Sequence, residues 1–299
     1  HNSGAIDTPL GQTVMAAGDH VTLQLQGASL LGYRIERGAL QALVEQAGQI
    51  SADGGTILIE ARALDALASA VVNHSGISQA RTVQEREGRI VLLGDLGVGQ
   101  THVHGTLDAS APEGGNGGFI ETSAATVNVA DSARIGTHSA RGANGTWLID
   151  PTDFTVAATG GDISGAALGT ALASGNVVLD STAGANEGAG DLYVRDQVNW
   201  SANRLTLRAQ RDIHLYQDLV GSGSAQLTMA HGLSTVDGAG TDYHLHNGSR
   251  VYLPEGLNLN MQRGSAGPLL GFQVITQLHT ASTPGGLSFY GINADGGGG

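Results

Sequence analysis

The sequence predicts an all-β protein folded as a right-handed parallel β-helix (β-solenoid) with short helical decorations. Three observations carry this prediction: a strand-like unit recurs, apolar and polar residues alternate within it, and 47 of the 299 residues are glycine. Many glycines between short β-branched runs indicate tight turns between short strands. Strand units that recur every 20–30 residues or so are typical of β-solenoids, and parallel crossovers are nearly always right-handed.

The first half of the chain repeats one pattern, in which an aliphatic residue, a small or polar stretch, a glycine and an apolar strand follow each other. It occurs in "NSGAIDTPLGQTVMAAGDHVTLQL" (2–25), "GQISADGGTILIEA" (48–61), "SGISQARTVQEREGRIVLLGD" (75–95), "HGTLDASAPEGGNGGFIETSA" (104–124) and "DSARIGTHSARGANGTWLID" (131–150). The aligned aliphatic positions are Ile50, Ile77, Leu107 and Ile135, and the aligned strand positions are Ile57, Ile90, Ile120 and Leu148. This spacing predicts that equivalent strands lie side by side in parallel, about 4.8 Å apart.

The second half repeats more tightly at first, in "GDLYVRDQVNWSANRLTLRA" (190–209) and "RDIHLYQDLVGSGSAQLTMA" (211–230). The aligned pairs are Asp191 with Asp212 and Leu205 with Leu227, and the second series continues at Leu257 and Leu287. Alternation at 191–195, 205–208 and 212–216 predicts strands with one side chain in two facing a core. The repeat length is expected to change near 151–190.

Helix signals are sparse. Helical spacing occurs at 37–48 and 61–73, and more weakly at 164–175, whereas the glycine-rich stretches 183–190 and 296–299 predict loops. The alternative all-β architecture is a β-sandwich, which needs hairpin turns. The nearest hairpin signals, Asp53-Gly54 and Asn247-Gly248, lack clean alternation on both sides.

Composition excludes several classes of partner. The net charge is −13, from 27 acidic and 14 basic side chains, and every basic residue is arginine. Such a surface repels nucleic acid and anionic lipid, and no apolar run approaches the roughly 20 residues that a membrane-spanning helix needs. The chain has no cysteine. It opens on "HNSGAIDTP" without a basic and then apolar leader, and we expect it to be a piece of a longer protein.

Several of these motifs resemble a known family. "NSGAIDTPLGQTVMAAGDHVTL", "VVNHSGISQARTVQEREGRIVLLGD", "GTLDASAPEGGNGGFIETSA" and "GTWLIDPTDFTV" are similar to segments of filamentous haemagglutinin-type exoproteins, large adhesins that Gram-negative bacteria secrete by the two-partner route. The resemblance covers about residues 2–230. It implies that residues 1–30 are the closing turns of a secretion-domain-like β-helix and that residues 31–299 continue it as a shaft. The NPN-type motif found near the start of that secretion domain does not occur here.

The resemblance also implies function. The chain is expected to be a shaft segment of an adhesin that is secreted or held on the outer cell surface of a Gram-negative bacterium. An outer-membrane pore transporter is the implied partner during secretion, and a glycan, exopolysaccharide or host surface is the implied ligand. No cofactor, catalytic residue, nucleic acid or membrane insertion is expected. The alternatives are a polysaccharide-processing β-helix enzyme and a haem-acquisition exoprotein.

One stretch, "GTWLIDPTDFTV" (145–156), concentrates unusual residues. Asp150 and Asp153 form a candidate carboxylate pair, since glycosidases work with two such groups. The structural interpretation is favoured, because Pro151 ends a strand after Asp150 and Asp153 can bond its own turn. Alternation puts Trp147 and Ile149 on the face opposite Leu148, and Phe154 begins the next strand. We therefore predict structural roles for Trp147, Asp150, Pro151, Asp153 and Phe154.

Two histidine pairs are the candidate metal ligands. His102 and His104 lie two residues apart, as do His244 and His246, and such pairs chelate Zn, Ni or Cu when a third ligand converges. Solvent-facing histidines without a metal are the default expectation. "EGGNGGF" (113–119) lacks the residues of a calcium or phosphate loop and is predicted to be a wide turn, while "QEREGR" (84–89) is predicted to be a solvated loop.

Overall fold

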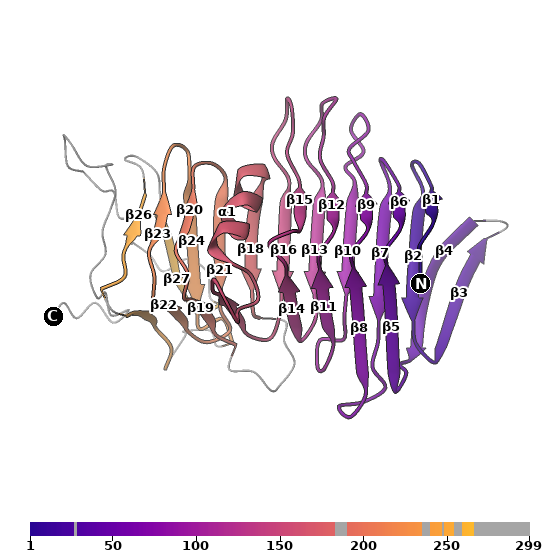
Figure 1. The fold of residues 1–299 in the computed structure, drawn as a ribbon, viewed down its shortest axis with the longest axis horizontal. Coiled ribbons are helices and arrows are strands. Elements are labelled where there is room, and N and C mark those ends of the chain that lie inside the picture. Colours follow the sequence, from indigo (N-terminus) through magenta and orange to yellow (C-terminus); the bar gives the residue numbers. More distant parts are fainter. Residues whose placement is uncertain (27–28, 183–189, 235–239, 247, 254–258, 266–299) are drawn as a thin grey trace.

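The computed structural model describes residues 1–26, 29–182, 190–234, 240–246, 248–253 and 259–265. In this part of the chain, short β-strands that pair mostly in parallel account for nearly all regular structure, and a single α-helix interrupts them. Figure 1 shows the strands side by side along the long axis of the molecule. The prediction of an all-β protein with parallel pairing is confirmed, and the antiparallel sandwich alternative is wrong.

One parallel sheet of nine strands runs through the whole described part. In order across the sheet its strands are β2 (Gln12–Ala17), β7 (Thr56–Ala61), β10 (Arg89–Leu93), β13 (Phe119–Ser123), β16 (Thr146–Asp150), β18 (Asn176–Asp180), β21 (Arg204–Arg208), β24 (Gln226–His231) and β27 (Leu259–Arg263). Each strand is separated along the chain from its neighbour in the sheet by a crossover that carries other strands. We call it the shared sheet.

Two shorter parallel sheets accompany the first half of the shared sheet. One contains β1 (Ala5–Asp7), β6 (Gln49–Ser51), β9 (Ile77–Gln79), β12 (Thr106–Asp108) and β15 (Arg134–Gly136). The other contains β5 (Gln41–Gln46), β8 (Ser69–His74), β11 (Gln100–Val103) and β14 (Thr126–Val129). These sheets, with the strands β2 to β13 beside them, form what we call the N-terminal region, residues 1–136.

The second half has two parallel sheets of its own. One contains β17 (Phe154–Val156), β19 (Leu192–Val194), β22 (Ile213–Leu215) and β25 (Tyr243–Leu245), and the other β20 (Val198–Trp200), β23 (Leu219–Gly221) and β26 (Val251–Tyr252). With β18 to β27 of the shared sheet they form the C-terminal region, residues 154–263. Strand β16 lies between the two regions in the shared sheet.

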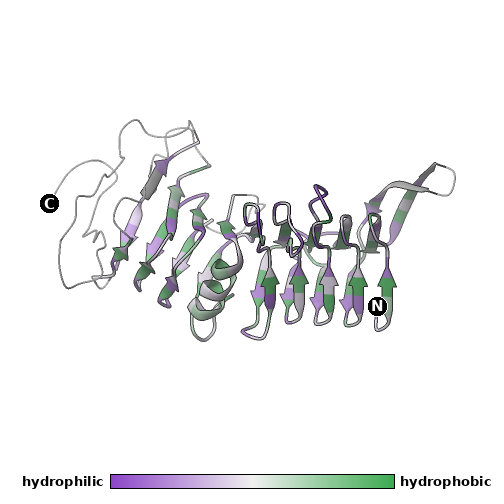
Figure 2. Cartoon of the chain, turned by 90° about the horizontal axis from the view of Figure 1, so that it is seen from above, coloured by the Kyte–Doolittle hydropathy of each residue, from purple (hydrophilic) through white to green (hydrophobic). Residues whose placement is uncertain are grey.

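The core is built from ladders of side chains that occupy the same position in successive strands. The first ladder of the shared sheet is Ile57, Ile90, Ile120, Trp147, Val177, Leu205 and Leu227, and two residues further on the second is Ile59, Leu92, Thr122, Ile149, Leu179, Leu207 and Met229. All of these side chains are buried. The alternation along the strands can be followed in Figure 2, and burial at roughly 25 cal/mol per Å2 of apolar surface drives it.

Thr122 is the one polar member of these ladders, and its hydroxyl serves as the hydrogen-bond partner of Trp147. The indole Nε1–H of Trp147 donates to Thr122 Oγ1 at 3.2 Å. A buried indole N–H needs such a partner. The position beside the Trp147 ring therefore carries a hydroxyl, where the rest of the ladder carries aliphatic or thioether side chains.

Helix α1 (Gly165–Ser174) belongs to the C-terminal region and packs against β20 of that region and β15 of the N-terminal region (Figure 1). Its N-terminus is capped by Ser164, whose Oγ accepts the backbone N–H of Ala167 at 3.0 Å. Gly165 and Gly169 allow a close approach, since a Cβ there would lie 2.1 and 2.4 Å from backbone oxygens next to or within β20. The helix prediction at 164–175 is confirmed.

The helices predicted at 37–48 and 61–73 are wrong, because these segments contain β5 and β8. In β5, Ala42 and Val44 are buried while Leu43 is 52% exposed, which is a period of two rather than 3.6. The leucines created helical spacing in the sequence, but parallel pairing of β5 with β8 decides the conformation. Tertiary context overrides local propensity here.

Two aligned positions were wrong by one residue. Ser78, not Ile77, pairs with both Ile50 and Leu107, and Ile77 is 44% exposed. Likewise Trp147, not Leu148, pairs with Ile120. In the second half, Leu205 pairs with Leu227 as predicted, and Leu227 then pairs with Leu259.

One feature was not predicted, an antiparallel hairpin of β3 (His20–Gln26) and β4 (Ser29–Arg37). It extends from the N-terminal end of the stack (Figure 2). The predictions for Leu257, Leu287, Asn247 and the loops at 183–189 and 296–299 lie outside the described residues. The proposed boundary at residue 30 stays a prediction.

Candidate functional site

An unbroken series of aspartates runs along one edge of the sheet β17-β19-β22-β25. Asp153 Oδ1 accepts the backbone N–H of Asp191 at 2.9 Å, and Asp191 Oδ1 accepts that of Asp212 at 3.0 Å. Asp212 Oδ1 in turn accepts the backbone N–H of Asp242 at 2.8 Å. We call these four residues the Asp ladder. Because each acceptor carboxylate bonds the backbone of the next repeat, the ladder holds neighbouring strands in register.

Asp191 is the most enclosed member of the Asp ladder, with its side chain 1% exposed. Arg211 donates to both of its oxygens, from Nε at 3.0 Å and Nη2 at 2.8 Å, and Tyr193 Oη donates at 2.9 Å. Burial alone would raise the pKa of Asp191, but these bonds and the Asp212 N–H outweigh it and hold the pKa below its ordinary value. Burial and the bond to Asp191 raise the pKa of Tyr193 to about 12.

Outward-facing rings cover the same sheet. Tyr193, His214 and His244 occupy one position in β19, β22 and β25. Tyr193 and His214 lie between buried residues, and His244 lies between buried Tyr243 and partly buried Leu245. Two residues further on lie Arg195, Tyr216 and His246. We call these six residues the ring cluster.

The rings of the ring cluster stack on one another. The centroids of Tyr193 and His214 lie 4.8 Å apart with planes 8° from parallel, and those of His214 and His244 lie 4.5 Å apart at 12°. Tyr216 and His246 stack at 4.0 Å and 8°. Parallel strands about 4.8 Å apart place identical positions at ring-stacking distance, so the spacing of the sheet itself produces the array.

Arg195 adds a cation to the ring cluster. Its guanidinium carbon lies 5.1 Å from the ring centroid of Tyr193 and 5.0 Å from that of Tyr216. Both contacts are within the range of a cation–π interaction. Arg195 is exposed, so this surface offers a positively charged group over two aromatic rings.

The histidines lie next to carboxylates of the Asp ladder. His244 Nε2 lies 3.8 Å from Asp212 Oδ2, and His214 Nε2 lies 4.0 Å from Asp191 Oδ2. The other ring nitrogen of His214, Nδ1, lies 3.1 Å from His246 Nε2. Burial, and then the neighbouring His244, lowers the pKa of His214.

The residues for which structural roles were predicted in 145–156 lie in different environments. Trp147, Pro151 and Phe154 are buried, so Trp147 and Ile149 are the pair that faces the core. Asp150 ends β16 and is half-buried, and Asp153 begins the Asp ladder. The carboxylate of Asp153 is engaged with the backbone, which favours a structural role over an acid–base role.

A carboxylate that the sequence did not mark is Asp162. It accepts from Asn128 Nδ2 at 3.1 Å and from the backbone N–H of Thr155 at 2.8 Å. Burial raises its pKa to about 6, the Thr155 bond opposes that rise, and the nearby charge of Asp153 adds to it. Its own backbone oxygen accepts from Val129 N–H at 2.7 Å, so Asp162 links the end of β14 to the start of the C-terminal region.

The two histidine pairs differ in their surroundings. His102 pairs with Asn73 and Asn128 on the neighbouring strands and contacts Gln100 Oε1 at 3.1 Å. His244, in contrast, is joined by His214 and Asp212, which the sequence analysis did not select. The repeated pattern of aspartate, apolar residue, ring and apolar residue in "DLYV", "DIHL" and "DYHL" is the signal that would have found them.

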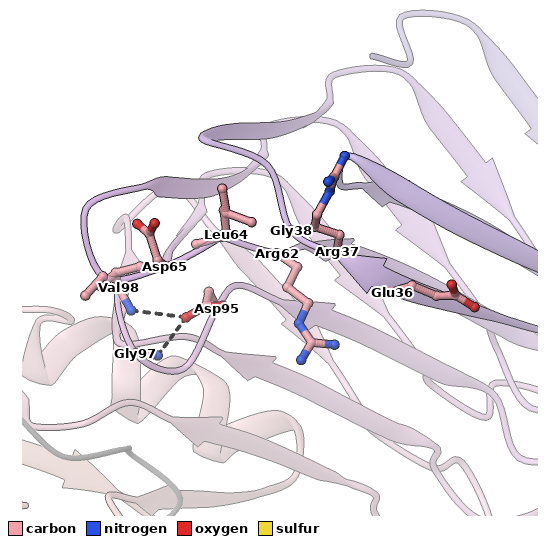
Figure 3. A pocket seen from close by; sticks show the side chains of 11 residues that line it. Glu36, Arg37, Gly38, Arg62, Leu64, Asp65, Asp95, Gly97 and Val98 are labelled. Carbon is pink, nitrogen blue, oxygen red and sulfur yellow. Dashed lines mark hydrogen bonds between the residues drawn. The ribbon is translucent and has the colours of Figure 1, made fainter.

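A cavity of about 490 Å3 lies beside the hairpin of the N-terminal region (Figure 3). Its walls include Arg37, Arg62, Leu64, Asp65 and Asp95. Asp95 Oδ1 accepts the backbone N–H groups of Gly97 and Val98 at 2.9 and 3.3 Å, and this bonding shapes the loop.

The segments 113–118 and 84–87, which belong to the two predicted loops, lie outside the strands. Residues 113–118 form an irregular turn in which Gly114 and Gly115 have φ of 128° and 84°, and Phe119 begins β13. Residues 84–87 are exposed, and Glu87 Oε1 accepts from Asn116 Nδ2 at 3.1 Å.

A scan against models of protein families finds no match to this chain, and a search of the curated proteins finds none either. No helix within the described residues has both the length and the apolar character that crossing a membrane requires.

Proposed function

We propose that this chain is a segment of a right-handed parallel β-helix that serves as the shaft of a bacterial adhesin, secreted or tethered to the outer surface of a Gram-negative cell. The shared sheet is the observation that carries the proposal. Nine parallel strands follow each other in chain order, and each crossover contributes strands to further parallel sheets. Such crossovers are right-handed in about 98% of known cases.

The resemblance of the sequence to filamentous haemagglutinin-type exoproteins supports the adhesin role. It also supports export through an outer-membrane pore transporter as an unfolded chain. The absence of cysteine suits that route, because a disulfide would obstruct threading.

The ring cluster is the surface that we assign to ligand binding, with a glycan, exopolysaccharide or host surface as the ligand class. It presents phenol and imidazole groups at their edges, and Arg195 supplies a cation. Polysaccharide hydroxyls and carboxylates are the groups that such donors recognise. The aspartates beside the cluster bond the backbone, so we assign them to support rather than to catalysis.

Small-angle scattering tests the shaft. We expect the profile of an elongated particle, and a compact globule would overturn the β-helix. Hydrogen exchange is a second test. It should be faster in the first and last described strands than in β13 to β18, because within the described residues the end strands of each parallel sheet pair on one side only.

A binding panel of neutral and acidic polysaccharides tests the ligand surface. We expect Arg195→Ala and Tyr216→Ala to abolish retention of the ligand that binds. The matched control is Arg89→Ala, which removes another arginine, 4.8 Å from the Phe119 ring, in the N-terminal region. Equal loss in all three variants, or no loss in the first two, would remove the ring cluster as the binding surface.

A further inference from the structure

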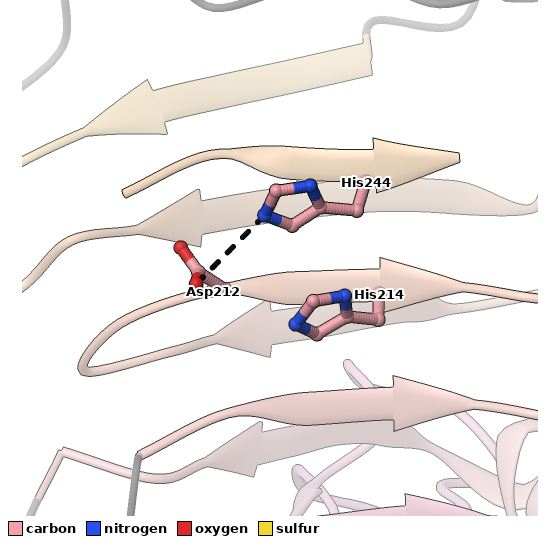
Figure 4. Close-up of side chains that lie close together, drawn as sticks. All are labelled: Asp212, His214 and His244. Atoms are coloured by element: carbon pink, nitrogen blue, oxygen red, sulfur yellow. Dashed lines mark ion pairs between the residues drawn. The ribbon is translucent and has the colours of Figure 1, made fainter. Parts of the chain in front are cut away.

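Three side chains from two neighbouring repeats converge at one end of the ring cluster. They are Asp212, His214 and His244, and their ligand atoms all lie within 4.8 Å of one another (Figure 4). His214 and His244 are register partners in β22 and β25. Asp212 lies two residues before His214, so the period of the strand puts both on the same face.

The two carboxylate oxygens of Asp212 have different neighbours. Its Oδ1 accepts the backbone N–H of Asp242 at 2.8 Å, while its Oδ2 lies 3.8 Å from His244 Nε2. The nearest cation, Arg211, contacts Asp212 Oδ2 at 3.6 Å but makes its two short bonds to Asp191. Oδ2 is therefore the oxygen that a metal ion could take.

The contact of His214 with His246 allows the tautomer that a metal ligand needs. Nδ1 of His214 lies 3.1 Å from Nε2 of His246. When Nδ1–H donates to His246, Nε2 keeps its lone pair on the side of Asp212 and His244. A ligand histidine in a metal site is oriented in this way by a second hydrogen bond.

We propose that Asp212, His214 and His244 bind a divalent transition-metal ion of the Zn2+ class. Two imidazole nitrogens and one carboxylate oxygen are a donor set that Zn2+ accepts, at about 2.0–2.2 Å, with a fourth position left for water or a ligand group. Ligand atoms around a tetrahedral ion lie ~3.4 Å apart, so the three atoms close in by about 1 Å when the ion binds. His244 is 40% exposed, which leaves its ring room to turn.

The local charge favours a cation. Asp191 and Asp212 place two carboxylates beside the histidines, and Arg211 offsets one of them. The whole chain carries a net charge of −13. The site joins two successive repeats, so a bound ion would fasten β22 to β25. This inference does not depend on the proposed function.

Calorimetric titration of the metal-stripped chain with ZnCl2 alone tests the site. We expect one Zn2+ per chain, with affinity at least tenfold weaker in His244→Ala and in Asp212→Asn. His246→Ala leaves all three ligands and removes the orienting contact with His214 together with the stacking of His246 on Tyr216, so we expect about a 10–100-fold loss. Zn2+ should also raise the melting temperature of the parent and not that of His244→Ala.

His102→Ala is the matched control, because it removes one histidine of an equally spaced pair that has no carboxylate at the neighbouring register positions. It should bind Zn2+ like the parent. Circular dichroism checks each variant for folding, and His244→Ala, a change of a partly exposed ring, decides the outcome if Asp212→Asn disturbs the strand. No uptake by the parent, unchanged binding by His244→Ala, or equal loss in His102→Ala would overturn the proposal.

Discussion

The N-terminal and C-terminal regions share one sheet but stack their repeats in different ways. In the N-terminal region, glycines before β6, β9 and β12 let backbones touch: a Cβ on Gly76 would lie 2.1 Å from Gly48 O, and one on Gly105 would lie 2.0 Å from Gly76 O. In the C-terminal region the Asp ladder performs the same task with side chains. The contacts between repeats in the N-terminal region leave no room for a Cβ atom, whereas those in the C-terminal region are made by aspartate side chains.

This difference has a consequence for function. Glycine contacts leave no side chain at the turn, so those turns of the N-terminal region present little chemistry. The Asp ladder puts carboxylates beside outward-facing rings, and the same register that stabilises the stack assembles the candidate site. In the C-terminal region, the residues that support the stack therefore lie beside the candidate site.

The largest expected effect tests whether the shared sheet couples the two regions. Trp147→Ala empties a buried position in β16, between them, and leaves Thr122 without its indole donor. We expect a loss of about 3–5 kcal/mol in the free energy of unfolding. Denaturant melts should show one transition shifted as a whole. A variant as stable as the parent would mean that the ring contributes nothing to the core.

Asp191→Ala tests the C-terminal region by removing atoms. It deletes the acceptor of Arg211, of Tyr193 and of the Asp212 backbone N–H. We expect a loss of about 3 kcal/mol, the lower end for breaking a buried ion pair, because half-exposed Arg211 can turn to water. Asp153→Asn, whose amide oxygen can keep the bond to the Asp191 backbone N–H, is the control. Equal losses in both would show that the Asp ladder is not stabilised by its buried member.

Acid should weaken the N-terminal region through His74. His74 in β8 is buried and lies 2.9 Å from Ser78 Oγ, and burial lowers its pKa to about 4. The unfolded chain takes up this proton near pH 6.5 and the folded chain does not, so stability falls as the pH drops from about 6.5 to 4. The loss from this group is about 3 kcal/mol.

Asp162 works in the opposite direction. Its folded pKa of about 6 lies above the ordinary value, so the folded chain takes up this proton first and gains stability over the same acid range. Denaturant melts from pH 7 to 4 should therefore fall less steeply in His74→Leu and more steeply in Asp162→Asn than in the parent. Parallel pH profiles for all three would contradict both assignments.

Gly76→Ala tests the N-terminal region by adding an atom. The new Cβ would meet Gly48 O at 2.1 Å, far inside contact distance, so the repeats must separate locally. We expect a loss of roughly 1–3 kcal/mol, as for other overpacked sites. Gly97→Ala is the control, because the nearest atom to a Cβ there is a carboxylate oxygen of Asp95 at 3.3 Å. Hydrogen exchange should increase in β6 and β9 and stay unchanged in β22.

The sequence predicted most of the strand pattern because alternation is a local property. The strands predicted at 191–195, 205–208 and 212–216 were placed correctly, since polar and apolar residues alternate within each of these segments. Register was harder to predict. Aligning aliphatic residues selected Ile77 and Leu148, whereas the ladders contain Ser78, supported by buried His74, and Trp147, supported by Thr122.

The candidate site was only half visible in the sequence. His244 and His246 were found because they are adjacent on one strand. Their convergence with His214 and Asp212 depends on a repeat of 30 residues between Asp212 and Asp242 after one of 21 between Asp191 and Asp212. Unequal repeats hide such register partners until the pairing is known.

The smallest expected effect separates the two interpretations of residues 145–156. Asp150→Asn keeps the shape of a half-buried side chain, and Asn suits a turn as well as Asp does, so we expect a change below about 1 kcal/mol. We also expect no turnover of neutral or acidic polysaccharides by the parent, because Asp153, the other member of the pair, is engaged in the Asp ladder. An active site would give the inverse pattern, in which Asp150→Asn and Asp153→Asn each stop product release while the melts stay unchanged. Reducing-sugar assays and melts of both variants, set beside Trp147→Ala, decide between a carboxylate pair that reacts and a corner that ends one strand and starts the next.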